Sequence, residues 1–536
     1  MNRHRLPGGS RARVLAGLGV LAVVAAGLPA LDRAVGPDGA AAAAALPLLA
    51  ATDASWLDRE HVRASLLRGA RDCDTPFRYS SVASSRMLSG TLLGADLAPV
   101  VALSGVTTTH SGLAGTTTTA QPATAPLTGP ETHSAPLSAT ALSTLGTQVT
   151  SVVALPTAGQ ELGVLRQAAR AAGDGEAGAA TGAVTETGAV RTTSGTGSVP
   201  DGTLPASAVI DLAKLAPATA TLAGAGLRVG AVASTAMLDG CLRDESGAPV
   251  VRDYGIADLR LVAATPAVPA VVSTAKTAAA TAQASVTTLE QTLASALSVG
   301  GLLGATTRVT VDVNTTTAIS GLLSQRLGEG SEVVVDLTSG TVEVDLARLL
   351  GGVNGRAANT QLVLDQAALD LVALRVTELL DAWVTSLTTA LDAALRAAAV
   401  TVRATLLGAT VLSIDTTVAA LLGGTATIGL LGLGVDGGAV LGTLVTGLTA
   451  GLFGPTGVVA TLGSTVRAAI APVTAAASTV LSGLRSVVSL VVNHQTEGGG
   501  AYDVAALRIG VVAGGATPLT ALRLATSSVG PVLARP

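Results

Sequence analysis

Polar and apolar residues alternate with a period of two along residues 332–346, on both sides of a short Thr-Ser-Gly connection. Glu332, Val334 and Asp336 in the first run fall on one face, and Val333, Val335 and Leu337 fall on the other. In the second run Glu343 and Asp345 likewise alternate with valines and a leucine. This alternation is typical of a half-buried antiparallel strand pair, and the glycine of the connection supplies the positive φ that a tight turn needs. The sequence therefore predicts a β-hairpin here.

A helical pattern follows over residues 365–399, where apolar side chains recur every three or four positions. A helix of this length spans roughly 50 Å. Charged residues such as Arg375 and Glu378 lie off the apolar stripe, so the stripe is expected to pack on the sheet of the hairpin. Trp383 is expected in the core, because large aromatic side chains bury the most area. The stripe consists of Leu369, Val372, Val376, Leu379, Trp383, Leu387, Leu391 and Leu395.

Similar patterns predict the other elements. Helices are expected over residues 274–297 and 465–492, and helical character is expected over residues 160–172. Strands are expected over residues 209–212, 254–261, 308–313 and 502–509. The predicted fold class is α+β, with antiparallel, sandwich-like sheets packed by long amphipathic helices.

Two of these strands share a motif. Residues 254–261 read Tyr-Gly-Ile-Ala-Asp-Leu-Arg-Leu, and residues 502–509 read Tyr-Asp-Val-Ala-Ala-Leu-Arg-Ile. The spacing of the tyrosine, alanine, leucine and arginine is the same in both. Self-similarity of this kind indicates a duplicated structural module.

The N-terminus has the layout of a secretory signal peptide, because four arginines precede an apolar run over residues 14–28 and small residues follow. We predict a signal peptide over residues 1–30; a retained membrane anchor is the alternative. The rest of the chain is expected to divide into an N-terminal segment over 31–105, a Thr/Ser/Pro-rich loop or linker over 106–147, a first α+β module over 148–300, and a second module over 301–536.

Composition narrows the class of protein. The 536 residues are 49% hydrophobic but only 1% aromatic, which predicts a core of many small side chains. The net charge is −4 at pH 7, and no basic patch is interleaved with aromatic residues, so nucleic acid is not an expected partner. The two cysteines, Cys73 and Cys241, are predicted to form a disulfide in an exported chain. Without neighbouring histidines or further cysteines they do not indicate a zinc site.

Few residues point to catalysis or cofactor binding. Residues 432–437 match the dinucleotide pattern GxGxxG, but no acidic residue follows about twenty positions later, as ribose binding requires. The histidines are isolated, no HExxH or GxSxG motif occurs, and His494 is expected at the surface. We therefore predict no catalytic, cofactor-binding or metal-binding residue.

The acidic face of the hairpin leaves two interpretations open. Paired carboxylates such as Glu332, Asp336, Glu343 and Asp345 could serve glycoside hydrolysis or calcium binding. The favoured interpretation is that they form the solvated face of a strand pair. The near absence of aromatic side chains for stacking on sugars disfavours a glycosidase.

Residues 418–452 contain one charge, Asp436, and their hydropathy would pass a simple test for a membrane span. Frequent glycines and the lack of a basic flank argue against a span. A Gly-rich buried layer, or strands and loops, is expected instead, and a membrane-retained envelope protein is the alternative.

Short motifs follow one another in a fixed order along the chain, at residues 86–97, 181–190, 254–261, 487–493, 502–509 and 522–530. Together they resemble the choice-of-anchor G family of actinobacterial exported proteins. The resemblance implies a surface or secreted protein with a shared body and interchangeable anchors. Residues 531–536 carry no sortase signal, apolar span or basic tail, so covalent wall attachment is not expected.

These observations lead to one expected function. The protein is predicted to be a non-enzymatic structural or adhesive protein, secreted or held at the cell surface. Its partners would be cell-envelope or extracellular components, with no nucleic acid and no small-molecule cofactor. The alternatives are an envelope protein that acts on or binds glycan through the acidic hairpin face, and a membrane-retained envelope protein.

Overall fold

The computed structural model describes residues 79–97, 105–136, 153–154, 165–184, 207–215, 223–299, 306–430, 437–512 and 520–535. The chain separates into two compact units, Met1–Ala64 and Ser65–Pro536, and all described residues belong to the second. Helices and antiparallel sheets occur together in this unit, which confirms the predicted α+β class. The predicted signal peptide lies outside the described residues.

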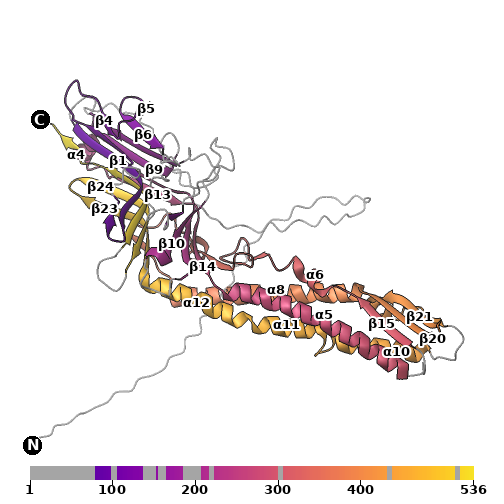
Figure 1. Cartoon of the computed structure of the whole chain (residues 1–536). Helices are drawn as coiled ribbons and strands as arrows, with labels where there is room; N and C mark the ends of the chain where they lie inside the picture. Colours follow the sequence, from indigo (N-terminus) through magenta and orange to yellow (C-terminus); the bar gives the residue numbers. More distant parts are fainter. Residues whose placement is uncertain are drawn as a thin grey trace, which may run out of the picture. The chain divides into compact units, whose positions relative to one another are not determined.

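Two of the sheets pack face to face as a sandwich (Figure 1). The nine-stranded sheet contains, in spatial order, β19 (Thr360–Leu362), β23 (Val488–Gly498), β24 (Ala501–Val511), β25 (Thr520–Val529), β1 (Tyr79–Leu92), β3 (Val106–His110) and β4 (Thr119–Gln121), and β2 (Ala95–Asp96) and β26 (Leu533–Ala534) also pair with β1. The six-stranded sheet contains β13 (Val251–Ile256), β12 (Val232–Asp239), β9 (Glu176–Ala183), β8 (Leu165–Ala171), β6 (Thr132–Pro136) and β5 (Pro126–Thr128).

The interior of the sandwich is lined by small side chains, including Ala83, Ala179 and Ala236. Some of the hydroxyls buried between the two sheets bond from one sheet to the other. Ser234 Oγ donates to Ser527 Oγ at 2.9 Å, and Thr181 Oγ1 donates to the Thr526 carbonyl at 2.7 Å. These bonds satisfy polar groups that would otherwise be buried without partners.

The chain passes between the sandwich and a third sheet, which has seven strands. Its order is β16 (Arg326–Leu327), β17 (Val333–Asp336), β18 (Thr341–Asp345), β14 (Leu259–Ala264), β11 (Ala225–Val229), β10 (Ala208–Asp211) and β7 (Val153–Ala154). A further sheet of four strands contains β15 (Thr306–Asp312), β20 (Ala399–Leu406), β21 (Ala409–Thr417) and β22 (Gly429–Leu430).

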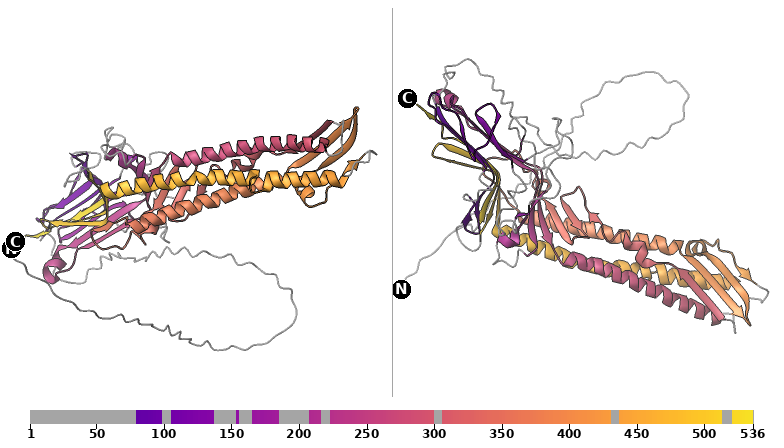
Figure 2. Two further views of the ribbon diagram at one scale, coloured as in Figure 1. Left: turned by 90° about the horizontal axis from the view of Figure 1, so that it is seen from below. Right: turned by 45° about the horizontal axis from the view of Figure 1, so that its top comes forward.

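Long helices run side by side between the seven-stranded and four-stranded sheets (Figure 2). They are α5 (Ala267–Val299), α8 (Gln366–Ala397), α10 (Gly437–Leu448), the π-helical turn η5 (Thr449–Phe453), α11 (Val458–Ala468) and α12 (Ile470–Val487). Helix α8 begins after Asp365, whose Oδ1 accepts the Ala368 amide at 2.8 Å. The short helices are α3 (Leu212–Leu215), α4 (Gly240–Ser246), α6 (Thr315–Ser320), α7 (Leu346–Leu349) and α9 (Val418–Leu422).

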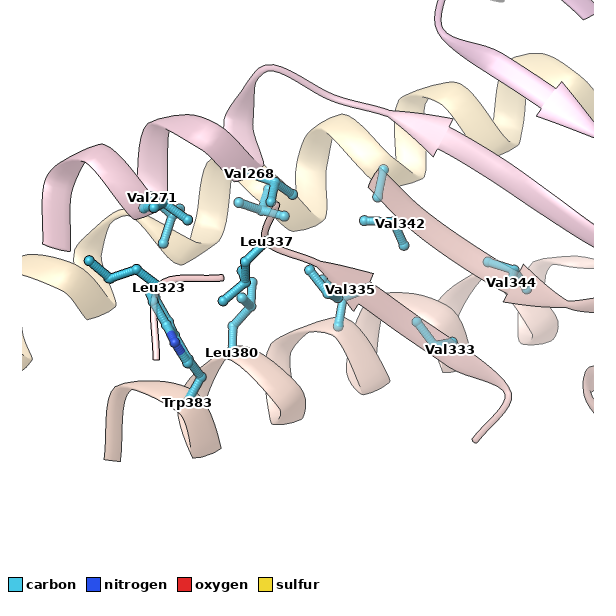
Figure 3. Packing of buried hydrophobic residues seen from close by; sticks show 14 of the residues in the cluster. Val268, Val271, Leu323, Val333, Val335, Leu337, Val342, Val344, Leu380 and Trp383 are labelled. Carbon is cyan, nitrogen blue, oxygen red and sulfur yellow. The ribbon is translucent and has the colours of Figure 1, made fainter. Parts of the chain in front are cut away.

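The predicted hairpin and long helix are confirmed. Strands β17 and β18 pair antiparallel, and Gly340 in their connection has φ of 72°. The hairpin packs against α8 and lies near the start of α5, with Leu380 beside Leu337 and Trp383 beside Leu323 (Figure 3). The predicted stripe of α8 is buried except at Leu379, which is half-buried while the neighbouring Leu380 occupies the core.

Several predictions about the N-terminal half are wrong. Residues 106–147, expected as a loop or linker, contain β3, β4, β5 and β6 among their described residues. Threonine is β-branched and favours extended backbone, so a Thr-rich segment can form strands. Residues 160–172, expected as helical, contain β8. The seven-stranded sheet also crosses the module boundary expected near residue 300, because β14 pairs with β18.

The apolar stretch 418–452 contains α9, β22, α10 and η5. Helix therefore occupies much of a region expected as a buried layer or as strands and loops. Among the described residues, the stretch Gly437–Val487 is long and apolar enough to cross a membrane by length and composition, although buried helices of soluble proteins pass the same test. In its most apolar window only 22% of the residues are buried.

The two copies of the Tyr-to-Arg motif have related surroundings. In the first copy the chain leaves one sheet for another between Tyr254 on β13 and Arg260 on β14. In the second copy Tyr502 and Arg508 lie on the single strand β24, but the ladder to both neighbours is interrupted at Ala506 between them. Both copies therefore change direction or pairing at the same motif position, as expected for a duplicated element.

Candidate functional site

The hairpin acids belong to a charged cluster on the seven-stranded sheet. Register places Arg228 of β11 opposite Arg260 of β14, and Arg260 opposite Asp345 of β18. Because side chains two residues apart on a strand share a face, Glu343 lies on the same face as Asp345. We call this set the charged face; it consists of Arg228, Arg260, Arg326, Glu332, Asp336, Glu343 and Asp345.

Glu343 is the centre of the charged face. It is only 2% exposed, and three guanidinium groups from three other strands surround its carboxylate. Arg228 Nη1 lies 3.1 Å from Oε1, Arg326 Nη2 donates to Oε2 at 3.2 Å, and Arg260 Nη1 lies 3.6 Å from Oε2. A buried carboxylate is tolerated only when such partners replace its hydration.

Asp336 closes the hairpin turn. Its Oδ1 accepts the amides of Thr338 at 2.8 Å and Ser339 at 3.1 Å, and its Oδ2 lies 3.3 Å from Arg326 Nη1. Burial raises the pKa of the Asp336 carboxyl, but the two amide bonds and the guanidinium outweigh it and leave the pKa below its ordinary value. Asp336 is therefore held ionised.

The two remaining acids have structural partners too. Asp345 Oδ1 caps α7 by accepting the Arg348 amide at 3.0 Å, and Oδ2 lies 3.4 Å from Arg348 Nε. Glu332 Oε1 accepts from Arg375 Nε of α8 at 3.1 Å. A hydrogen bond from its own backbone amide, together with Arg375, lowers the pKa of Glu332. Every acid of the charged face is thus compensated.

The positions of these acids distinguish between the interpretations of the hairpin. The solvated-face prediction is wrong, because Asp336, Glu343 and Asp345 are all buried. A retaining or inverting glycosidase needs one carboxyl kept protonated by its surroundings, whereas the surroundings of Glu332 and Asp336 lower the pKa of both carboxyls. Within the described part of the chain, no group of three or more His, Cys, Asp or Glu is arranged to hold a metal ion.

Sequence reasoning found the acids of the charged face but missed its arginines. Arg228 and Glu343 are 115 residues apart in the chain. The signal that could have found them is the alternation around Arg228 and Arg260, which places a charge on the open side of two otherwise apolar strands.

A second polar cluster surrounds Tyr254, the first residue of the repeated motif. The Tyr254 hydroxyl donates to the Val353 carbonyl at 2.7 Å and accepts the Arg356 amide at 3.0 Å. Asn354 exchanges two hydrogen bonds with the backbone of Ile256, at 2.8 and 2.9 Å. The loop after α7 is thereby fastened to β13. Burial raises the pKa of Tyr254 to about 12.

Replacing Tyr254 by phenylalanine is expected to lower the free energy of unfolding by about 1.5 kcal/mol at neutral pH, because a buried carbonyl and a buried amide lose their partner. The tyrosine pKa is about 10 in an unfolded chain and about 12 in the folded protein. The contribution of Tyr254 is therefore complete below pH 10 and is lost as pH rises through 12. Urea unfolding of both proteins across this range measures it, and equal stability at neutral pH would contradict the assignment.

The other candidate residues are not brought into one site. Cys241 on α4 is disulfide-bonded, while Cys73 lies outside the described residues, so the pairing stays a prediction. Of the GxGxxG match, only Gly437 is described, and it begins α10. His494, predicted at the surface, lies on β23 and is half-buried.

A groove of about 400 Å³ lies between α5 and α11, on the helical side of the unit. Its lining carries hydroxyls such as those of Thr277, Thr281 and Thr461, together with small residues such as Gly451, and no ionisable side chain. Such a groove offers no general acid, base or charged group for catalysis.

Comparison with known proteins gives one match. The model of a family described as "Domain of unknown function (DUF8394)" matches residues 83–530. No curated protein and no solved structure matches the chain. The resemblance to the choice-of-anchor G family stays a prediction.

Proposed function

The chain belongs to the DUF8394 family, whose function is unknown, and we propose that it is an exported, non-enzymatic protein that acts as a structural or adhesive body. Its place would be the cell envelope or the surrounding medium. Its partners would be components of the envelope or of the extracellular space.

The non-enzymatic part of this proposal rests on the surroundings of the Glu343 carboxylate. The acids of the hairpin lie on the seven-stranded sheet, and the most buried of them, Glu343, lies among Arg228, Arg260 and Arg326. Such a cluster joins four strands of the seven-stranded sheet and presents no free acid or base to a substrate. The surroundings of the carboxylates therefore favour a role in holding the strands in register.

The disulfide of Cys241 supports the export part of the proposal. Structural disulfides persist in oxidising compartments and are rare in the cytosol. The arginines before the apolar run over residues 14–28 agree with an export signal. The adhesive or structural role is the expectation that follows from the motif resemblance.

Fractionation of the producing cells into medium, wall and membrane tests the proposal. We expect the protein in the medium or wall fraction, cleaved near residue 30. Its intact mass should be lower than that of the reduced chain by the hydrogens lost on forming one disulfide. Protein that stays in the membrane pellet after a carbonate wash, with residues 1–30 still present, would contradict export and favour the membrane-retained alternative.

A further inference from the structure

The chain contains a second cross-strand arginine pair, at the second copy of the repeated motif. Arg508 of β24 lies directly opposite Arg523 of β25, just as Arg228 lies opposite Arg260. Both side chains are partly exposed, on the face of the nine-stranded sheet that is turned away from the six-stranded sheet. Like charges directly opposite each other destabilise a strand pair unless something compensates them.

Within the described part of the chain, neither Arg508 nor Arg523 forms an ion pair or a hydrogen bond. The segment that connects their strands, residues 513–519, contains no aspartate or glutamate. Among the described residues no carboxylate pairs with Arg508 or Arg523, whereas the first pair is compensated by Glu343.

The strand register shows which acids accompany the first arginine pair but not the second. Asp345 lies opposite Arg260, and Glu343 lies opposite Val262 in the next row on the same face. The matching positions beside Arg508 hold Val491 and Ser489. The acid Asp258, which bonds Arg260 Nε at 2.9 Å, is matched in the motif by Ala506. All three acids around the first pair are replaced by uncharged residues around the second.

The neighbourhood of this second pair contains hydroxyl groups and small residues. Ser89 and Thr526 share a hydroxyl hydrogen bond of 3.0 Å beside Arg523. In the row beyond the pair, Gly510 lies opposite Ala521. Asp503 also faces this surface, and one of its oxygens accepts from Thr496 at 3.0 Å.

The two arginines affect the pKa of the neighbouring His494. Burial first, and then Arg523 and Arg508, lower its pKa to about 4, while Asp503 acts in the opposite direction. Both arginines are therefore close enough to His494 to disfavour its charged form.

We propose that Arg508 and Arg523 bind an oxyanion, a phosphate or carboxylate group of a ligand, which takes the place that Glu343 holds between Arg228 and Arg260. Guanidinium groups suit this task, since they donate paired hydrogen bonds to planar or tetrahedral oxyanions. The proposal does not depend on where the protein is located.

Thermal unfolding of the whole chain in sodium phosphate, sodium acetate and sodium chloride at matched ionic strength tests the site. Wild-type Tm is expected to rise with one of the oxyanions beyond its change in chloride, because a ligand that binds the folded state stabilises it. A response to phosphate identifies that group as the ligand chemistry, and a response to acetate alone identifies a carboxylate.

Three variants make the test specific. Arg508→Gln should lose the oxyanion response while its Tm in chloride rises by about 1 °C, because repulsion is relieved. Ser489→Glu should also raise Tm in chloride and lose the response, because it supplies the missing carboxylate. Arg228→Gln, the matched change in the compensated pair, should lower Tm and keep the response.

A second readout separates binding from general salt effects. An anion held by the arginines should raise the pKa of His494, measured by NMR titration of its ring protons and assigned with His494→Gln. The proposal is overturned if wild type shows no response up to 100 mM oxyanion (roughly the limit for weak specific sites). It is also overturned if Arg508→Gln responds as wild type does, as general salt exclusion would produce.

Discussion

Replacing Glu343 by glutamine is expected to lower the free energy of unfolding by about 3 kcal/mol. The substitution keeps the size of the side chain but leaves Arg228, Arg260 and Arg326 without the carboxylate that they share. Breaking a buried ion pair on one side is costly because the remaining charges lose their compensation while staying out of water. The arginine side chains are about one-third exposed, so solvent should screen their charges and reduce the loss of stability.

Urea unfolding followed by circular dichroism measures this change. The matched control is Glu378→Gln on α8, where an exposed carboxylate pairs with Arg375 at 2.8 Å. An exposed pair contributes little, so the control should change stability by less than about 0.5 kcal/mol. If the two substitutions had equal effects, Glu343 would not be the centre of a stabilising cluster.

Replacing Trp383 by alanine is expected to lower the free energy of unfolding by about 4 kcal/mol. The indole is 2% exposed and lies between the hairpin and α6, where it also donates from Nε1 to the Leu322 carbonyl at 2.8 Å (Figure 3). Its removal leaves a cavity in the core beside Leu323 and an unpaired carbonyl at Leu322, and both increase the loss of stability.

Leu374→Ala provides the control on the same helix, because Leu374 is 53% exposed. Its truncation removes few contacts and should change stability by less than about 0.5 kcal/mol. Equal stability of wild type and the Trp383 variant would show that α8 does not pack on the hairpin through this residue.

Local periodicity was sufficient to predict the hairpin and α8. The alternation over residues 332–346 and the three-to-four spacing around Trp383 depend on one strand pair and one helix, which short-range pattern describes well. Residues 106–136 were harder, because runs of threonine with prolines are common in loops as well as in strands. Strand β8 was mistaken for a helix because its leucine and alanine residues also favour helix.

The ion pairs of the charged face could not be predicted from the sequence. Glu343 stood out as one of four acids on a hairpin, but its partners come from β11, β14 and β16, whose register only the folded sheet fixes. Burial could not be inferred either, since acids on a strand pair are usually solvated. The repeated motif gave a usable signal, because Arg260 and Arg508 both lie opposite another arginine.

We propose that the hairpin acids hold the strands of the seven-stranded sheet together. A double-mutant cycle on Arg228→Gln and Glu343→Gln tests it most directly, because Glu343 is the acid to which Arg228 is bonded across the strands. We predict a coupling free energy of at least about 1 kcal/mol from urea unfolding of the four proteins. Effects that add within about 0.4 kcal/mol would contradict the claim and return the carboxylate to the list of candidate catalytic groups.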